Sequence, residues 1–260
     1  LATLACDTRR SEFFRKELIA TLQLVDAGTV MPDQLKGSWA GAVGNFQFLP
    51  SVYREHAVDA DGDGSIDLWN TFPDAAESAA RFLIARGWQP GERWGREVRL
   101  PAEFDYQLTD STASVNEWAS QGIQQADGRA LPNSDITARL LLPAGAKGPA
   151  FLVYPNFDVI MRWNPSQYYA LAVGHLADRL NGAGPLKTSP PEEPALTIEA
   201  VTELQRTLAG YGFDPGPADG RMGPATRGGI RAYQLANGLI PDGHPTLETL
   251  ERLGIKPSQR

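Results

Sequence analysis

The sequence contains a single cysteine, Cys6, among its 260 residues. One thiol cannot form an internal disulfide, and it cannot supply the several thiolates of a multi-cysteine metal site. Positive charge is also scarce, because 24 lysines and arginines stand against 31 acidic residues and leave a formal net charge of −7. This balance argues against nucleic acid as the main partner, since the neutralisation of phosphates requires an excess of lysine and arginine.

Long apolar segments are absent as well, and none approaches the roughly 20 residues that a membrane-spanning helix requires. The three histidines, at positions 56, 175 and 244, are scattered and do not have the spacing of a metal site. What remains is ordinary, with 42% apolar and 21% charged residues. Such a composition is typical of a soluble globular protein, and the length is sufficient for one or two domains.

The first residue is Leu1 rather than methionine, and the opening LATLA has the character of an apolar helix that is already under way. We therefore expect the sequence to begin inside a domain. Any signal peptide or lipid anchor is then expected upstream of Leu1.

A stretch rich in proline and glycine divides the sequence. Residues 182–196 begin with GAGPLKTSPPEEP, a composition that favours an extended linker over a packed element. The regions on its two sides differ in charge, because residues 197–260 hold seven basic and seven acidic side chains, so the net negative charge lies before them. We predict one domain over residues 1–181 and a second, smaller one over residues 197–260.

The C-terminal domain is predicted to consist of three helices. Thr197 is suited to cap the first, Pro224 to open the second and Thr246 to cap the third. The first helix has an apolar stripe with helical spacing, formed by Ile198, Val201, Leu204 and Leu208. Two Asp-Gly pairs, at 219–220 and 242–243, each precede a helix and are interpreted as turns. About 60 residues are near the lower limit for a self-sufficient core.

The N-terminal domain mixes helices and strands. A helix is predicted after Ser11, another from Asp74 to about residue 87, and a third after Ser166. The stripe of the first comprises Phe14, Leu18, Leu22 and Val25. Between the helices, residues 139–142 and 151–154 flank a turn-rich segment and predict a β-hairpin. The fold class is therefore α+β, with the strand-rich part as an insertion between helices.

Residues 59–67, DADGDGSID, follow the pattern of a calcium-binding loop. Ca²⁺ prefers six to eight hard oxygen ligands, and crowded carboxylates repel one another unless a cation lies between them. The usual glutamate at loop position 12 is replaced by Asn70, so Asp74 is predicted to supply the bidentate carboxylate. The predicted ligands of a structural Ca²⁺ are Asp59, Asp61, Asp63, the backbone carbonyl of Ser65, and Asp74. The alternative is a solvated acidic turn, and no organic cofactor is predicted.

Residues 37–51, GSWAGAVGNFQFLPS, combine small residues, aromatic rings and amide side chains. Glycine and alanine allow the backbone to approach another element or a ligand closely. Flat apolar rings beside amide groups are suited to sugar rings, which have an apolar face and hydroxyl edges. The composition alone leaves two interpretations open, a tightly packed structural segment or part of a carbohydrate-binding groove.

Four blocks in the same order resemble the lytic murein transglycosylase B family of the lysozyme-like superfamily. They are LATLACDTRRSEFF, GSWAGAVGNFQFLPSVY, DADGDGSIDLW and YPNFDVIMRWNPSQYYALAVGHLADRL, within residues 1–181. Residues 197–260 resemble a peptidoglycan-binding domain through LQRTLAGYGF, DGRMGPATRGGIRAYQ and GLIPDG. The resemblance implies a lysozyme-like, mainly helical catalytic domain with a small β insertion, followed by a three-helix binding domain.

The resemblance also implies a reaction. Such enzymes cleave the β-1,4 bond between N-acetylmuramic acid and N-acetylglucosamine without water, because the muramoyl C6 hydroxyl attacks its own anomeric carbon and leaves a 1,6-anhydro end. One glutamate acts first as the acid and then as the base, which differs from the two-carboxylate scheme of most glycosidases. Implied partners are glycan strands, stem peptides and proteins of cell-wall synthesis. The implied location is the periplasm of a Gram-negative bacterium, soluble or lipid-anchored to the outer membrane.

Individual positions follow from the family motifs. Ser38, Gln47 and Asn164 match cleft residues that assist catalysis, and Arg9 and Arg10 match a basic pair suited to carboxylates. Aromatic positions that line the family's groove correspond to Phe13, Trp39, Phe48, Phe82, Trp163 and Tyr169. Trp163 replaces a more frequent tyrosine, so a hydrogen bond from this position would come from the indole N–H. For the other aromatic residues, a core role is as compatible with the sequence as contact with the ligand.

The catalytic glutamate of the family precedes the segment that matches residues 1–14, so we expect it upstream of Leu1. Glu12, Glu17 and Glu55 lie in other motifs and are predicted to be exposed charges. Two hypotheses follow. The leading one is a cell-wall-cleaving lyase tethered to its polymer by the small domain. The rival is a truncated or inactive protein that binds or organises peptidoglycan without cleaving it.

Overall fold

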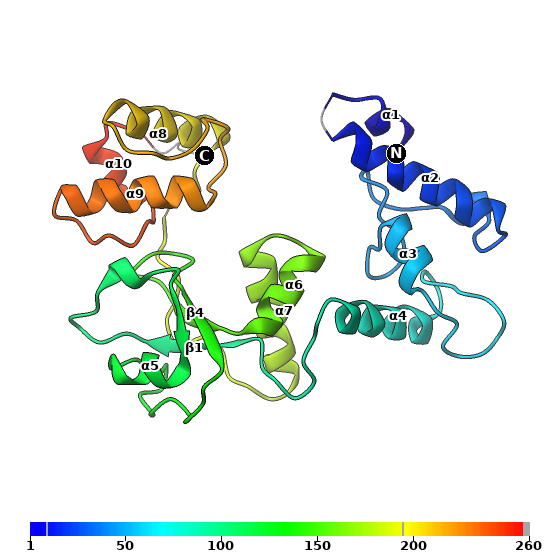
Figure 1. The fold of residues 1–260 in the computed structure, drawn as a ribbon, viewed down its shortest axis with the longest axis horizontal. Helices are drawn as coiled ribbons and strands as arrows, with labels where there is room; N and C mark the ends of the chain where they lie inside the picture. Colours follow the sequence, from blue (N-terminus) through cyan, green and yellow to red (C-terminus); the bar gives the residue numbers. More distant parts are fainter. Residues whose placement is uncertain (9, 194, 257–260) are drawn as a thin grey trace. The chain divides into compact units, whose positions relative to one another are not determined.

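In the computed structural model, which describes residues 1–8, 10–193 and 195–256, the chain forms two compact units (Figure 1). One comprises Leu1–Gln89 and the other Pro90–Arg260. The boundary between the units falls after α4, whereas the predicted linker at residues 182–196 lies inside the second unit. Each unit is described separately below.

The N-terminal unit is helical. Its elements are α1 (Ala2–Ala5), α2 (Ser11–Asp26), the 3₁₀ helix η1 (Pro32–Gln34), α3 (Pro50–His56) and α4 (Phe72–Ala85). Helix α2 packs against both α1 and α3, and α3 also contacts α4. Proline stands in the first turn of α3 and of α4, where the missing N–H is not needed by the helix.

The buried face of α2 differs from the predicted stripe. Leu22 is 60% exposed, and the buried residues are Phe14, Glu17, Ala20 and Leu24. The prediction failed because Glu17, expected to be an exposed charge, is only 4% exposed. Its carboxylate accepts hydrogen bonds from the backbone N–H and the hydroxyl of Ser51, at 2.9 and 2.7 Å. A buried carboxylate therefore joins α2 to the start of α3, and hydrophobic periodicity alone does not reveal it.

The second unit contains a five-stranded antiparallel sheet in the order β2-β4-β5-β1-β3. The strands are β1 (Gly95–Arg99), β2 (Thr112–Ser114), β3 (Gln124–Gln125), β4 (Thr137–Leu141) and β5 (Ala150–Val153). The predicted hairpin is confirmed as β4 and β5, whose register pairs Leu140 with Leu152. Both residues are fully buried, and α5 (Val115–Ser120) contributes Trp118 to the same core.

Helices α6 (Pro155–Trp163) and α7 (Gln167–Leu180) follow the sheet. Pro165 stands between them, and the residue before a proline avoids the helical conformation, so α6 ends at this point. Ser166 caps α7 as predicted, because its side chain accepts a hydrogen bond from the N–H of Tyr169. Trp94 lies against Gly174 of α7, where an added Cβ would be 2.4 Å from the indole Cδ2. The indole N–H of Trp94 donates to Asp178, at 3.0 Å.

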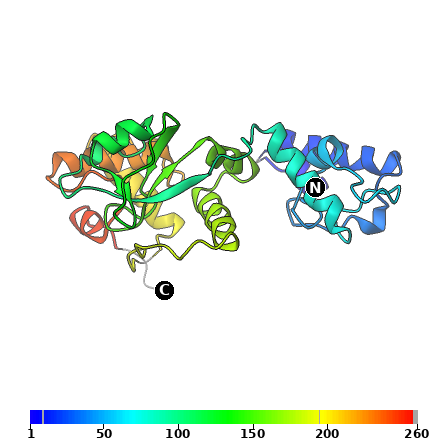
Figure 2. The same ribbon diagram turned by 90° about the horizontal axis from the view of Figure 1, so that it is seen from below.

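Three further helices form the C-terminal part of this unit, and they lie together in both views (Figures 1 and 2). They are α8 (Ile198–Gly210), α9 (Pro224–Ala236) and α10 (Leu247–Arg252). Thr197 and Thr246 cap α8 and α10, and Pro224 opens α9, as the sequence predicted. Their shared core contains Leu204, Leu208, Ile230, Tyr233 and Leu250.

The expected combination of a mainly helical domain, a small sheet and a three-helix C-terminal region is confirmed. The remaining short element is the 3₁₀ helix η2 (Tyr106–Leu108). Among the described residues, no helix combines the length and the apolar character that crossing a membrane would require.

Candidate active site and acidic loop

Ser38 lies in a tight turn that begins the glycine-rich segment. Gly37 and Val43 form an isolated antiparallel bridge, and the N–H of Ser38 donates to the carbonyl of Ala42 at 2.8 Å. The hydroxyl of Ser38 accepts a hydrogen bond from the N–H of Ala42 at 3.1 Å. A Cβ at Gly37 would lie 2.2 Å from the carbonyl oxygen of Ala42, so this turn requires glycine. The half-buried hydroxyl of Ser38 is thus held by its own turn.

Gln47 lies in the next turn, which Val43 and Phe48 close through two mutual backbone hydrogen bonds of 2.7 and 2.8 Å. Its backbone is left-handed, with a φ of 56°, a conformation that costs L-residues free energy. The side-chain amide of Gln47 donates to the carbonyl of Gly44 at 3.0 Å and is exposed. The structure therefore places Ser38 and Gln47 in two consecutive turns that share Val43.

The turn of Gln47 contacts Leu68, which directly follows the acidic loop, residues 59–67. The N–H of Asn45 donates to the carbonyl of Leu68 at 2.8 Å. A Cβ at Gly44 would be 2.7 Å from both the Cβ and the carbonyl oxygen of Leu68, and Gly44 also has a positive φ of 70°. Glycine is required here for two reasons, the close approach and the conformation. The loop and the turn form one connected structure.

The predicted aromatic residues of this unit separate into buried and accessible ones. Phe48 and Phe82 are 3% and 5% exposed, and their rings pack 5.9 Å apart. This placement favours the core role over contact with a ligand. Trp39 is 83% exposed, an unusual position for an indole. Phe13 is half-buried, and the guanidinium of Arg10 lies 4.3 Å from its ring centroid. Arg9 lies outside the described residues.

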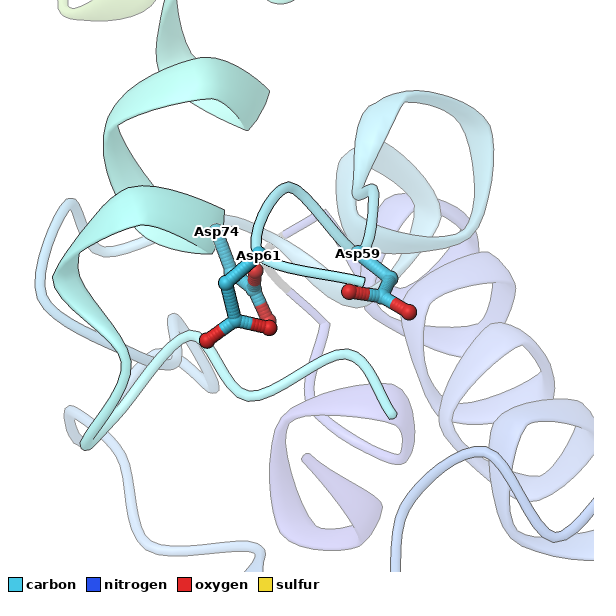
Figure 3. Close-up of side chains that lie close together, drawn as sticks. All are labelled: Asp59, Asp61 and Asp74. Atoms are coloured by element: carbon cyan, nitrogen blue, oxygen red, sulfur yellow. The ribbon is translucent and has the colours of Figure 1, made fainter. Parts of the chain in front are cut away.

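Two carboxylates of the acidic loop converge with one from the first turn of α4 (Figure 3). Asp59, Asp61 and Asp74 each offer one oxygen within 4.8 Å of the others. Asp74 is 1% exposed, and its two oxygens accept hydrogen bonds from the N–H groups of Ala60 and Asp67, at 2.7 and 2.9 Å. Two backbone N–H groups of the loop, one near its start and one at its end, are thereby joined to the first turn of α4. All three groups are hard oxygen donors of the kind that Ca²⁺ prefers.

Of the other two predicted ligands, Asp63 has a local partner. One oxygen of Asp63 accepts hydrogen bonds from the N–H and the hydroxyl of Ser65, both at 2.8 Å. Asp63 is not part of the group of three converging carboxylates. The carbonyl of Ser65 was predicted as a ligand, and its neighbour Ile66 accepts a hydrogen bond from the hydroxyl of Tyr53 at 2.6 Å. Burial raises the pKa of Tyr53 to about 12, and nearby carboxylates add to the effect.

The crowded carboxylates of the loop have shifted pKa values. Hydrogen bonds from backbone N–H groups, that of Gly64 first, hold the pKa of Asp59 below its usual range. For Asp61, the hydrogen bond from the N–H of Asp63 lowers the pKa, but desolvation and the repulsion of the neighbouring carboxylates outweigh it and raise the pKa. A cation between Asp59, Asp61 and Asp74 would relieve this repulsion.

The remaining predicted residues belong to the second unit. Asn164 is exposed at the end of α6, where its N–H donates to the carbonyl of Ile160 at 3.2 Å. Trp163 is half-buried one residue earlier. Tyr169, in the first turn of α7, is 37% exposed, and partial burial raises the pKa of its hydroxyl. Asn164, Trp163 and Tyr169 thus gather at the junction of α6 and α7.

Comparison with known proteins identifies the family. The model of the transglycosylase SLT domain matches residues 1–178, which is most of the chain. The chain belongs to the transglycosylase SLT family. Residues 197–253 match the peptidoglycan binding domain. The resemblance inferred from the four sequence blocks is therefore confirmed, and so is that of the C-terminal helices.

Three proteins with known names or structures are similar to this chain. Membrane-bound lytic murein transglycosylase B of Escherichia coli K12 is 36% identical over 182 residues, 68% of this chain and 48% of the relative. A crystal structure of SltB3 from Pseudomonas aeruginosa in complex with NAG-anhNAM-pentapeptide has a TM-score of 0.93 and 46% identity, covering 97% of this chain and 69% of that one. The Escherichia coli lytic transglycosylase Slt35 in complex with calcium has a TM-score of 0.57 and 35% identity, covering 69% and 57%.

The chain spans about half the length of the curated Escherichia coli relative that it matches. Glu17, predicted to be an exposed charge, is instead a buried residue whose carboxylate holds the start of α3, a few residues after the turn of Gln47. Its only signal in the sequence was its place on the otherwise apolar face of α2, between Phe14 and Ala20.

Proposed function

We propose that the protein is a lytic transglycosylase of peptidoglycan. It cleaves the bond between N-acetylmuramic acid and N-acetylglucosamine without water and leaves a 1,6-anhydro end. The observation that carries this proposal is the match of residues 1–178 to the transglycosylase SLT domain. It is supported by 46% identity and a TM-score of 0.93 to SltB3, whose crystal structures contain NAG-anhNAM-pentapeptide and NAG-NAM-pentapeptide.

In this proposal, the chain's own residues orient the substrate around the catalytic glutamate that the family resemblance implies. Within the N-terminal unit, the amide of Gln47 hydrogen-bonds hydroxyl or N-acetyl groups of the sugars, and the hydroxyl of Ser38 approaches the glutamate. Because Gln47 is fixed by its turn, its amide is positioned before the substrate arrives, which reduces the entropy lost on binding. Trp39 offers an exposed ring face to a sugar, and Arg9 and Arg10 pair with carboxylates.

The test is digestion of purified peptidoglycan sacculi by the full-length protein that contains residues 1–260. Mass spectrometry should detect muropeptides with 1,6-anhydro ends, and Gln47→Ala should lower their rate of formation by about 10²-fold, as the loss of a preorganised polar contact does. Ser111→Ala, far along the chain in the second unit, is the control and should leave the rate unchanged. Products with reducing ends only would identify a hydrolase instead.

The rival function is a wall-binding or scaffolding protein without catalytic activity. It rests on what the family resemblance implies, namely that Glu12, Glu17 and Glu55 do not correspond to the catalytic glutamate. Retention of the full-length protein on sacculi with no anhydro product, at any enzyme concentration, would support it. The small C-terminal region is proposed to tether the protein to the polymer in either case.

We also propose that the acidic loop binds one structural Ca²⁺ through Asp59, Asp61 and Asp74, with Asp63 and the Ser65 carbonyl as further predicted ligands. The convergence of three carboxylates within 4.8 Å supports it, as does the relative Slt35, which was crystallised with calcium. When bound, Ca²⁺ would neutralise the crowded charges and fix the loop beneath the turn of Gln47. Titration calorimetry with CaCl₂ should give one site per chain, and Asp61→Asn should weaken it at least tenfold. Asp33→Asn, outside the loop, is the control.

The proposed location is the periplasm of a Gram-negative bacterium, in a soluble or lipid-anchored form. The substrate, peptidoglycan, and the names of the relatives support this location. Fractionation of cells that express the full-length protein should place it with periplasmic markers or in the outer membrane. Recovery in the cytoplasmic fraction would contradict the proposal.

A further inference from the structure

The C-terminal helical region contains the same hydrogen-bonded turn twice. Each copy consists of a buried glutamine on one helix, an Asp-Gly pair in the following loop, and a threonine near the start of the next helix. The first copy, the Asp219 turn, is formed by Gln205, Asp219, Gly220 and Thr226. The second copy, the Asp242 turn, is formed by Gln234, Asp242, Gly243 and Thr249.

The hydrogen bonds among the glutamine, the aspartate and the glycine are the same in both copies. In the first, the amide nitrogen of Gln205 donates to Asp219 Oδ1 at 3.1 Å, and its oxygen accepts from the N–H of Gly220 at 2.9 Å. In the second, the amide nitrogen of Gln234 donates to Asp242 Oδ1 at 2.9 Å, and its oxygen accepts from the N–H of Gly243 at 2.8 Å.

The backbones of the two turns agree as well. Gly220 and Gly243 have the same φ of 73°. In each turn the aspartate Oδ1 also accepts from the N–H two residues later, that of Arg221 at 3.0 Å and that of His244 at 2.8 Å. Both glutamines are 1% exposed. In each turn these hydrogen bonds to the aspartate all go to Oδ1, and none of them uses the second carboxylate oxygen, Oδ2.

The Asp242 turn is occupied by another segment of the same chain. The N–H of Ala146, in the loop between β4 and β5, donates to Asp242 Oδ2 at 2.8 Å. Gly145 is pressed against the same turn, because a Cβ on it would lie 2.8 Å from Asp242 Oδ2 and 2.8 Å from the Cβ of His244. Asp242 is consequently only 4% exposed. This contact shows what the turn binds, which is the backbone N–H that follows a glycine.

The Asp219 turn presents the same group to solvent. Asp219 is exposed, and the side-chain amide of Gln205 and the backbone N–H of Arg221 both donate to its Oδ1. The side chain of Arg221, also exposed, stands where the second copy has His244. The first copy thus has the geometry of a peptide-binding turn together with a guanidinium that can pair with a carboxylate.

The conformation of the segment on the Asp242 turn defines the ligand further. Gly145 has a φ of 70°, in the left-handed region, so an L-residue there would be strained by its conformation and by its Cβ. A D-residue adopts this φ without strain, and its Cβ takes the other position on Cα. A peptide seated in the same way therefore has glycine or a D-amino acid directly before the donating N–H.

We propose that the Asp219 turn binds the backbone of a small-residue peptide in which a D-amino acid precedes the N–H that donates to Asp219 Oδ2. The peptides of peptidoglycan contain D-amino acids, so this inference rests on the proposed function and extends it. It assigns the peptide, rather than the glycan, to this surface of the C-terminal helices. Arg221 contacts a carboxylate of the same peptide.

The test is a titration of the ¹⁵N-labelled 260-residue chain, followed by the amide resonances of Gly220 and Arg221. The probe is acetyl-L-Ala-D-Ala-L-Ala with a free C-terminal carboxylate, and acetyl-L-Ala-L-Ala-L-Ala with the same free carboxylate is the stereochemical control. We expect both resonances to move with the probe and the apparent Kd to be about tenfold lower for the D-isomer, the factor that corresponds to the penalty for a left-handed L-residue. Equal affinities, or no movement of either resonance, would overturn the proposal.

Asp219→Asn replaces the accepting Oδ2 with a donor and retains an oxygen for Gln205, so it should abolish the shifts. Asp214→Asn is the matched control, since it removes the same charge from another exposed aspartate whose side chain accepts from the N–H of Gly216. Unchanged binding by Asp219→Asn would also overturn the proposal. The isomer preference of the unmodified chain remains decisive if the variant does not fold.

Binding to intact sacculi separates this proposal from the proposed function. If the unmodified chain is retained on sacculi but shows no preference for the D-isomer, the inference fails while a peptidoglycan ligand stands. If the D-isomer binds as expected but sacculi retain none of the chain, the turn is a D-peptide site and the proposed function fails.

Discussion

At the scale of one residue, Gln47 combines a left-handed backbone conformation with a proposed role in binding the substrate. A left-handed conformation costs an L-residue about 1–2 kcal/mol, whereas glycine adopts it readily. Residues held in such conformations by their surroundings gather at functional sites. Gln47 is exposed, and no packing requirement explains its side chain. The family motif identified the residue in the sequence, but only the structure reveals its φ of 56°.

This strain leads to a prediction about two substitutions at one position. Gln47→Gly and Gln47→Ala both remove the hydrogen bond to Gly44, but only glycine relieves the backbone. We expect the glycine variant to be more stable than the alanine variant by about 1 kcal/mol in urea unfolding. Both variants should be equally impaired in forming anhydro products. An alanine variant as stable as the glycine variant would show that the left-handed conformation is not retained in solution.

Glu17 provides a second prediction at this scale. Glu17→Ala leaves the N–H and hydroxyl of Ser51 without their acceptor in a buried place and should lower the free energy of unfolding by about 2–3 kcal/mol. Glu17→Gln keeps an acceptor and should lose less. Glu12→Ala, on the exposed side of the same helix, is the control and should change stability by no more than about 0.5 kcal/mol. Equal effects at positions 12 and 17 would contradict the buried hydrogen bonds.

At the scale of elements, local signals predicted some parts of the fold and not others. The caps at Ser166, Thr197 and Thr246 and the β4–β5 hairpin were predicted because each depends on residues close together in sequence. Strand β3 was not, since two glutamines carry no alternating pattern and are held as a strand by pairing with β1 and by the bridge from Gln124 to Ala130. Tertiary pairing determined that element, as it often does for short strands.

The contact between α7 and Trp94 gives a prediction for a helix. Alanine favours helices more than glycine does, yet Gly174→Ala would bring a Cβ to 2.4 Å from the buried indole. We expect a loss of about 1–3 kcal/mol in the free energy of unfolding, from overpacking. Gly228→Ala, inside α9 with no atom within 4 Å of the added Cβ, is the matched control. It should raise stability by about 0.5–1 kcal/mol. Stabilisation by both substitutions would contradict the packing of Trp94 on α7.

At the scale of the whole molecule, charge is distributed unevenly, and the acidic loop concentrates part of it in the N-terminal unit. The sequence predicted the loop as a metal site, and the structure brings together Asp59, Asp61 and Asp74 but turns Asp63 toward Ser65. The pattern of alternate residues could not resolve this difference, because it specifies which residues carry oxygen and not where each carboxylate points.

Because the chain forms two units, the proposed Ca²⁺ site can be tested by asking which unit Ca²⁺ stabilises. A ligand that binds only the folded state adds RT ln(1 + [L]/Kd), about 2.7 kcal/mol when its concentration is 100 times Kd. Because the three converging carboxylates lie in Leu1–Gln89, this gain belongs to the N-terminal unit. Hydrogen exchange with and without a chelator should therefore show faster exchange of α3 and α4 after Ca²⁺ removal and no change in α8 and α9. Asp61→Asn should abolish the dependence, whereas Asp33→Asn should keep it. A uniform change in both units would mean that the chelator acts elsewhere, and the loop would then be a solvated turn.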